Sequence, residues 1–416
     1  MLFQLTLSHR KVFHSKYHDL ILSVSGSWRR LEVYADGRHV PVQLFPELKS
    51  RWALVVLHTV GEPVRLSGTS AEFEVSARLA EEGVRDPSSW LKGSIEEGRI
   101  RVVTDHLSTI PSFIAFGEVI GVAQWPRAIG PASVVRSPPC SILELKADGF
   151  SSLSSTCEEG SEGRPITTEE LLKALEGSVS RNVGSRCAVC LSGGLDSGLL
   201  LKLVSEQVRS VVAITVGVSG STDFQRARRA ARSFGVDHVI HELTEDEVAR
   251  TATYLRRVMG LERPMDLSLA VVQYTCASLA RSLGLCQLVV GQGADELFGG
   301  YAKYVRALEE GGERKLEALM RSDLRELWTH GLVRDYVSAA LGGATLTVPY
   351  LAPEVVSIAR ALPAHLKVKG SDRKVALREV ARVASLPEEV WAAEKRAAQY
   401  STGVEKVIRR WLRRTL

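Results

Sequence analysis

Residues 191–197 read LSGGLDS, and this glycine-rich loop lies between a run of apolar residues and a run of helix-forming residues. The apolar run, 187–191, predicts a short buried strand, and residues 198–208 predict a helix. Glycine lets backbone N–H groups approach an anion closely, and the N-terminus of a helix carries partial positive charge. The sequence therefore predicts a phosphate-binding loop at the junction of a strand and a helix.

The polar residues of this loop have distinct predicted roles. The hydroxyls of Ser192 and Ser197 can donate hydrogen bonds to a pyrophosphate, whereas Asp196 would repel phosphate and suits a Mg²⁺ ligand. The lysine-bearing loop GxxxxGK followed by Ser or Thr does not occur here, so this is not the common γ-phosphate cradle. A plain glycine turn without a ligand is the alternative that the loop alone leaves open.

A second motif, GQGADELFGGY at residues 291–301, follows another short apolar run at 287–290. In a parallel sheet, ligands bind beyond the carboxyl ends of the strands. Both motifs follow predicted strands, so Asp196 and Asp295 could share one Mg²⁺ beside a nucleotide. The alternative is that Asp295 and Glu296 only cap the helix that follows.

Strands and helices alternate in the second part of the chain. The apolar runs 187–191, 211–216 and 287–290 predict strands, and 198–208, 223–234 and 269–283 predict helices. This alternation predicts an α/β fold with a parallel sheet flanked by helices.

The organisation of the chain follows from its length of 416 residues, which suits two domains. Residues 1–150 predict a smaller β-rich domain and 166–416 the nucleotide-binding domain. Between them, 151–165 lies in a stretch rich in Ser, Gly and Glu, which predicts a linker.

With these motifs in place, the chain resembles the asparagine synthetase family, within the ATP pyrophosphatases that carry SGGxDS. The resemblance covers roughly residues 165–405. It rests on LSGGLDS, GQGADELFGGY, the segment VPYLAPEVVSIARALPAHLK and the segment KRAAQYSTG. It implies a ligase that forms an amide in two steps, with aspartate as the usual acid. The carboxylate of the acid attacks the α-phosphate of ATP, giving an acyl-adenylate and pyrophosphate, and ammonia then displaces AMP.

The resemblance also implies roles for individual residues. Lys374 falls where the family has a lysine against the phosphates, and a solvated lysine is the alternative. Lys395 and Arg396 lie in the family's closing cationic segment. The implied nucleotide contacts are Leu191, Val216 and Gly291, the implied pyrophosphate loop is Ser192, Gly193, Gly194, Asp196 and Ser197, and the implied magnesium ligands are Asp196 and Asp295.

Three departures from the family pattern concern the chemistry. Gln292 stands where most members have Glu, and Gln cannot transfer protons, so either Glu296 or water covers that step or the chemistry differs from that of the family. Ala352 replaces the usual Asp. The stretch with threonine and arginine that recognises aspartate is not evident at 263–269, although a bidentate arginine is the natural partner of an α-carboxylate.

The amino-terminal part differs further. Members that use glutamine carry a catalytic cysteine directly after the initiator methionine, and here Leu2 occupies that place. Residues 93–130 resemble the glutaminase fold weakly. We expect a degenerate glutaminase-like domain without the catalytic cysteine, and an unrelated β-rich domain is the alternative. Nitrogen would then come from free ammonia or from a separate amidase.

Composition limits the partners. The net charge of +5 is mildly basic, and the patch at 409–414 suits either RNA phosphates or the solvated face of a terminal helix. No apolar run approaches the ~18 residues of a membrane span, so we expect no membrane and a cytoplasmic protein. A nucleic-acid partner is not favoured, and a homodimer stays open. The alternatives to a ligase are a tRNA-modifying enzyme on the same loop and an ATP-binding partner protein without turnover.

Overall fold

The computed structural model describes residues 93–94, 101–113, 136–144, 166–221, 223–392 and 402–414 with their side chains, and the strands before residue 156 by their backbone. The chain divides into two compact units. The first comprises Met1–Ala80 and Ser89–Glu158, and the second Glu81–Ser88 and Glu159–Leu416.

The first unit is built of strands, which confirms the predicted β-rich part of the chain. They form a six-stranded sheet in the order β15-β14-β10-β9-β8-β7, a seven-stranded sheet in the order β13-β11-β12-β6-β3-β4-β5, and the pair β1-β2. The strand β15 extends past residue 150 into the predicted linker, because it pairs antiparallel with β14. The bounds are β1 (Phe3–Leu7), β2 (Arg10–His14), β3 (Asp19–Val24), β4 (Arg30–Ala35), β5 (Arg38–Gln43), β6 (Trp52–His58), β7 (Val64–Ser67), β8 (Ser70–Ser76), β9 (Trp90–Glu96), β10 (Arg99–Thr104), β11 (Phe113–Phe116), β12 (Val119–Ala123), β13 (Ser133–Arg136), β14 (Ser141–Lys146) and β15 (Gly149–Ser155).

The second unit is built around a five-stranded sheet in the order β18-β17-β16-β19-β20, in which every pair is parallel. Its strands are β16 (Arg186–Cys190), β17 (Ser210–Val218), β18 (Asp237–Leu243), β19 (Gln287–Val289) and β20 (Thr345–Thr347). From β16 the chain runs outward to β17 and β18 and then returns to β19 on the other side. The crevice between the ends of β16 and β19 is therefore a topological switch point, where sheets of this kind bind ligands.

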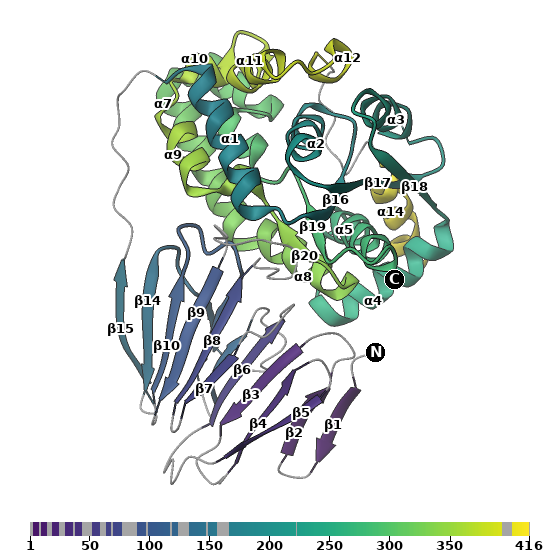
Figure 1. Ribbon diagram of the computed structural model, residues 1–416. Helices are drawn as coiled ribbons and strands as arrows, with labels where there is room; N and C mark the ends of the chain where they lie inside the picture. The colour runs from purple at the N-terminus through teal and green to yellow at the C-terminus, as the bar shows by residue number, and fades with distance from the viewer. Residues whose placement is uncertain are drawn as a thin grey trace. The chain divides into compact units, whose positions relative to one another are not determined.

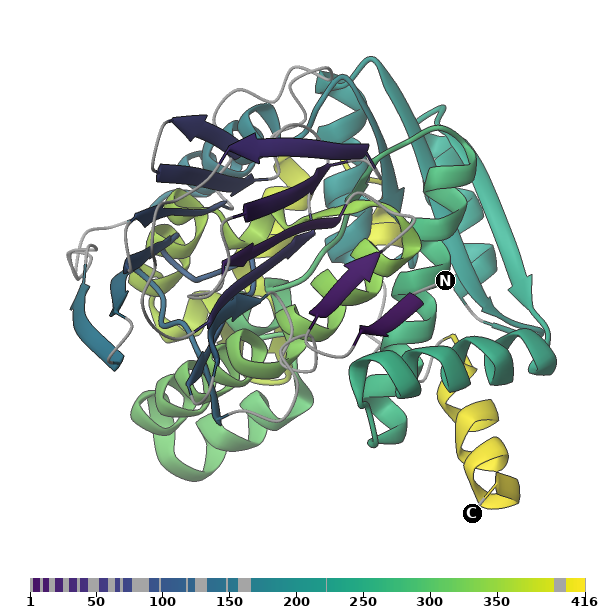
Figure 2. The same ribbon diagram turned by 90° about the horizontal axis from the view of Figure 1, so that it is seen from below.

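Helices cover both faces of this sheet. In Figure 1, α2 and α3 lie on one face and α5 lies on the other, and α14 packs against α4 and α5 near the C-terminus, as Figure 2 also shows. This arrangement confirms the predicted α/β class. The helices are α1 (Thr168–Asn182), α2 (Leu195–Gln207), α3 (Asp223–Ser233), α4 (Glu245–Met259), α5 (Pro264–Ser282), α6 (Ala294–Phe298), α7 (Ala302–Glu326), α8 (Leu332–Gly342), α9 (Pro353–Ala361), α10 (Ala364–Lys367), α11 (Val375–Val383), α12 (Glu388–Trp391) and α14 (Val404–Thr415), with the short hairpin of β21 (Val368–Lys369) and β22 (Asp372–Arg373) before α11.

Local sequence explains where these helices begin. Thr167 and Glu170 form a capping box at the start of α1, and Thr244 and Glu247 form another at the start of α4. The helix α2 begins at Leu195, three residues before the predicted start, because Gly194 with its extended backbone is the N-cap. Asp196 and Ser197 therefore lie in the first turn of α2. Among the described residues, no helix has the length and apolar character that a membrane crossing requires.

Candidate active site

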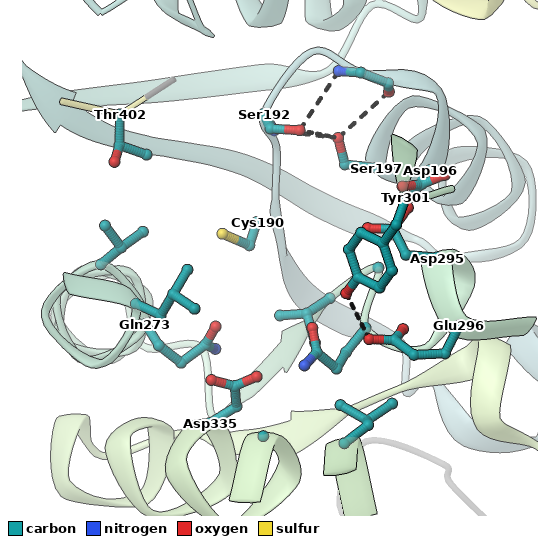
Figure 3. A pocket seen from close by; sticks show the side chains of 18 of the residues that line it. Cys190, Ser192, Asp196, Ser197, Gln273, Asp295, Glu296, Tyr301, Asp335 and Thr402 are labelled. Carbon is teal, nitrogen blue, oxygen red and sulfur yellow. Dashed lines mark hydrogen bonds between the residues drawn. The ribbon is translucent and has the colours of Figure 1, made fainter. Parts of the chain in front are cut away.

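A cavity of about 540 Å³ opens beyond the carboxyl ends of the parallel strands. Figure 3 shows that its walls come from segments far apart in the sequence. Ser192 and Ser197 lie at one end, Asp295, Glu296 and Tyr301 along a side, and Asp335 at the other end. The lining residues all belong to the second unit.

The LSGGLDS loop closes on itself through its two serines. Ser197 Oγ accepts a hydrogen bond from the Ser192 backbone N–H at 3.1 Å, and the two hydroxyl oxygens are 3.0 Å apart (Figure 3). No side chain caps the N-terminus of α2. Ser192, Gly194 and Ser197 therefore line the cavity at the positive end of a helix, an arrangement that suits phosphate.

Gly193 has a structural reason to be glycine. Its φ is +73°, and a Cβ there would overlap the backbone of Arg226 and Ala227 in α3. The loop is thus packed directly against α3, which fixes its path.

Two carboxylates from different elements meet at a single lysine. Lys374 Nζ lies 2.5 Å from both carboxylate oxygens of Asp196 and 2.6 Å from Asp295 Oδ1. Asp196 is in the first turn of α2, Asp295 is in α6, and Lys374 immediately precedes α11. Lys374 is only 3% exposed, so the solvated-lysine alternative is wrong.

The backbone around this cluster is held in unusual conformations. Lys374 has φ +58° and ψ 41°, in the left-handed region that a residue with a side chain seldom adopts. A Cβ at Gly300 would overlap Asp295 Oδ1 and Lys374 Cε. Burial lowers the pKa of the Lys374 ammonium, and the neighbouring Asp196 carboxylate opposes that shift.

The donor set fits a magnesium ion. Both carboxylates contact the same nitrogen, so their oxygens are close enough to share one cation. Hard carboxylate oxygens are the protein ligands that Mg²⁺ prefers, usually one or two of them together with phosphate oxygens and water. Asp196 and Asp295 are the residues that would hold it.

Glu296 is the second acidic residue of the GQGADELFGGY motif. It is buried, and its Oε1 accepts a hydrogen bond from Tyr301 Oη at 2.6 Å (Figure 3). Burial raises the pKa of this carboxyl above its ordinary value, although the Tyr301 bond opposes the shift. No side chain caps the N-terminus of α6, and Asp295 contacts Lys374 instead. The alternative that Asp295 and Glu296 only cap a helix is therefore wrong.

The far end of the cavity contains an ion cluster that the sequence did not reveal. Arg334 in α8 donates to both oxygens of Asp335, at 2.7 and 3.1 Å, and to Asp266 Oδ1 in α5 at 2.9 Å. All three residues are buried. Burial alone would lower the pKa of Arg334, but the Asp335 and Asp266 carboxylates outweigh it and raise that pKa.

Most of the residues predicted for the site line this one cavity. Gly193 does not line the cavity, because it packs against α3. Gln292 lines the cavity. Lys395, Arg396 and Leu2 lie outside the residues that the structure describes. Ala352 is buried at the N-cap of α9. The predicted residues that line the cavity are Leu191, Ser192, Gly194, Asp196, Ser197, Val216, Gly291, Asp295, Glu296 and Lys374.

Other residues support the site without having been predicted. Thr215 Oγ1 donates to the Leu191 carbonyl at 2.6 Å, and Tyr350 Oη donates to the Asp196 carbonyl at 3.0 Å. Thr215 is a single hydroxyl residue between apolar Ile214 and Val216 in β17, which was a usable signal. Tyr350 is 154 positions from Asp196, and only the tertiary fold brings them together.

The family model for asparagine synthase matches residues 170–336 and 308–416 of this chain. A Methanocaldococcus jannaschii protein that bears the name of a glutamine-hydrolysing asparagine synthetase is 30% identical over 274 residues, which cover 58% of this chain and 50% of that protein. Asparagine synthetase B of Escherichia coli is 27% identical over 338 residues, which cover 72% of this chain and 58% of that protein.

The chain thus spans about half the length of the curated relatives it matches. Among solved structures, an NH3-dependent NAD synthetase from Campylobacter jejuni aligns with 60% of this chain and 86% of its own, at 14% identity and a TM-score of 0.29. A score this low does not establish a shared fold.

Proposed function

This chain belongs to the asparagine synthase family, and we propose that it is an ATP-dependent ligase that activates a carboxylic acid and then converts it to an amide. One observation carries the proposal most directly. Asp196, Asp295 and Lys374 come from three elements and meet beside a serine-glycine loop at the N-terminus of α2. That combination offers both a cation site and donors for a polyphosphate.

In the first step, a carboxylate oxygen of the acid attacks the α-phosphorus of ATP and the bond to the β-phosphate oxygen breaks. Pyrophosphate leaves, and an acyl-adenylate remains. Ser192, Ser197 and the open N-terminus of α2 hold the departing pyrophosphate. The Lys374 ammonium stabilises the negative charge that develops at the α-phosphate, and it does so in a site where few water molecules screen it.

Magnesium, held by Asp196 and Asp295, would neutralise phosphate charge when bound. The same two carboxylates pair with Lys374. If they held a metal ion, the Lys374 ammonium would be available to phosphate oxygens.

In the second step, ammonia attacks the acyl carbon and AMP leaves with the electron pair of the acyl–oxygen bond. The nitrogen must lose a proton, and Glu296 is the buried carboxylate of the motif that can accept it. A raised pKa makes a carboxylate a stronger base near neutral pH. Gln292, which lines the same cavity, has no such capacity.

Aspartate is the acid that the names of the relatives suggest first, and free ammonia or a separate amidase would supply the nitrogen. The proposal is tested by exchange of labelled pyrophosphate into ATP, with a panel of carboxylic acids and without ammonia. We expect exchange that requires both the acid and Mg²⁺. If no acid supports exchange while ATP still binds, the alternative of a partner protein without turnover would replace the ligase.

A further inference from the structure

Two cysteines from different elements meet beside the cavity. Cys190 is the last residue of β16, and Cys276 lies in α5, which packs on this strand. Their Sγ atoms are 3.4 Å apart, and the two thiols can share a hydrogen bond in which either one is the donor. Both thiols are free, so the structure describes the reduced form of this pair.

The two thiols differ in their access to small molecules. Cys190 is half-buried and lines the cavity, and its side chain lies among the other lining residues in Figure 3. Cys276 is fully buried. The hydrogen bond with Cys190 and burial raise the pKa of the Cys276 thiol well above its ordinary value, so Cys276 stays protonated. A small reagent that enters the cavity therefore reacts at Cys190 first.

A bond between the two sulfurs would change the geometry of the site. Because a disulfide bond is about 2.05 Å long, the sulfurs would have to approach each other by about 1.4 Å. The movement acts on the end of β16, two positions before Ser192, and on the helix that carries Gln273, which also lines the cavity. A misplacement of about 1 Å in such a site can cost two orders of magnitude in rate.

We propose that Cys190 is an oxidation site for hydrogen peroxide, that Cys276 then converts the product to a disulfide, and that this disulfide opposes nucleotide binding. The Cys190 thiolate attacks one peroxide oxygen, the O–O bond breaks, and a sulfenic acid and hydroxide form. The Cys276 sulfur then attacks the Cys190 sulfur and the S–O bond breaks. The oxygen leaves with the Cys276 proton as water, so two thiols lose two electrons and the peroxide gains them.

The opposition between disulfide and nucleotide is reciprocal. A nucleotide held beside the phosphate loop would occupy the cavity that gives peroxide its access to Cys190. If the disulfide lowers the affinity for the nucleotide, the nucleotide must disfavour the disulfide by the same factor. This part of the inference rests on the proposed function, whereas the oxidation of the thiol pair does not.

The test uses the full chain, first reduced and then exposed to hydrogen peroxide with and without Mg²⁺ and a non-cleavable ATP analogue. Peptide mass spectrometry follows the disulfide-linked peptide pair that contains Cys190 and Cys276. We expect this pair to form, and saturating nucleotide to slow its formation by at least about ten-fold. Absence of the pair, or an unchanged rate while nucleotide is bound, would overturn the inference.

Variants test the order of the two steps. In Cys276→Ala, the reaction should stop at a sulfenic acid that dimedone labels at Cys190. The matched control is Cys286→Ala, a half-buried cysteine outside the cavity lining, which should form the disulfide at the wild-type rate. Dimedone labelling of Cys276 in folded Cys190→Ala would contradict the assignment of Cys190 as the first thiol to react.

Calorimetry separates this inference from the proposed function. The oxidised protein should bind the ATP analogue about ten-fold more weakly than the reduced protein, and dithiothreitol should restore the affinity. Equal affinities of the two forms would reject the opposition between disulfide and nucleotide. If the reduced protein binds no nucleotide but still forms the disulfide, the proposed function fails and the oxidation of the thiol pair is upheld.

Discussion

Lys374 concentrates several physical constraints in one residue. Its ammonium contacts two carboxylates, it is buried, and its backbone is left-handed. Conformations of this kind are costly and persist where the surrounding structure enforces them, commonly at functional sites. The position is therefore the most informative single residue to change.

Replacing Lys374 with Met keeps the length of the side chain and removes its charge. Without the cation, charge at the α-phosphate is no longer stabilised, and the rate of pyrophosphate formation should fall by about two to three orders of magnitude. A steady-state pyrophosphate assay measures this, with the exposed Lys369→Met as the matched control. A loss of less than ten-fold in the folded variant would exclude Lys374 from the chemistry.

Glu296 predicts a pH dependence of stability. Its pKa is raised in the folded protein, so the fold retains a proton that the unfolded chain releases above about pH 4.3. Between the pKa of Glu296 in the unfolded chain and its higher pKa in the folded protein, the unfolded state binds fewer protons than the folded state. The contribution of Glu296 to the free energy of unfolding therefore decreases as pH rises through this window.

The Glu296→Gln variant removes this titration while leaving an acceptor for Tyr301. Relative to the variant, the wild-type protein should lose stability as pH increases through that window, as measured by chemical denaturation at a series of pH values. Glu389→Gln, at an exposed position, should follow the wild-type curve. Parallel curves for wild type and Glu296→Gln would contradict the raised pKa.

At the scale of elements, the turn between α6 and α7 decides whether the cluster can form. Gly300 lies in this turn, directly against Asp295 and Lys374. The helix α6 is only five residues long, so its carboxylate is positioned by the turns around it rather than by a long helix.

A Gly300→Ala substitution inserts a methyl group where Asp295 Oδ1 and Lys374 Cε now lie. Overpacking of this kind typically costs about 1–3 kcal/mol, and here it also displaces the two functional groups. We expect pyrophosphate formation to fall nearly as far as in Lys374→Met. Gly177→Ala, in α1 where only the mobile end of Arg181 is near, should retain full activity. Wild-type activity of Gly300→Ala would show that the cluster tolerates displacement.

The elements also show what sequence could and could not predict. The strands at 187–191, 211–216 and 287–290 were predictable because parallel buried strands are continuous apolar runs. The helix at 198–208 was placed three residues late, because the extended N-cap at Gly194 is a backbone feature. The ion pair between Arg334 and Asp266 was not predictable, since the two residues are 68 positions apart and meet only through the packing of α5 on α8.

At the scale of the whole molecule, the site belongs to one unit. The cavity and both segments matched by the asparagine synthase model fall within the second unit, and none of their residues belongs to the first unit. Membership of the asparagine synthase family supports the proposed reaction class. A single chemical question, whether the acid is activated at the α-phosphate, therefore decides the account.

Transfer of a heavy oxygen isotope answers that question most directly. The acid is labelled in its carboxylate oxygens and incubated with the protein, MgATP and ammonia, and the products are analysed by mass spectrometry. Attack at the α-phosphorus predicts one labelled oxygen in AMP and unlabelled pyrophosphate. Label in inorganic phosphate with formation of ADP, or no label in any phosphorus-containing product, would contradict activation of the acid as an adenylate.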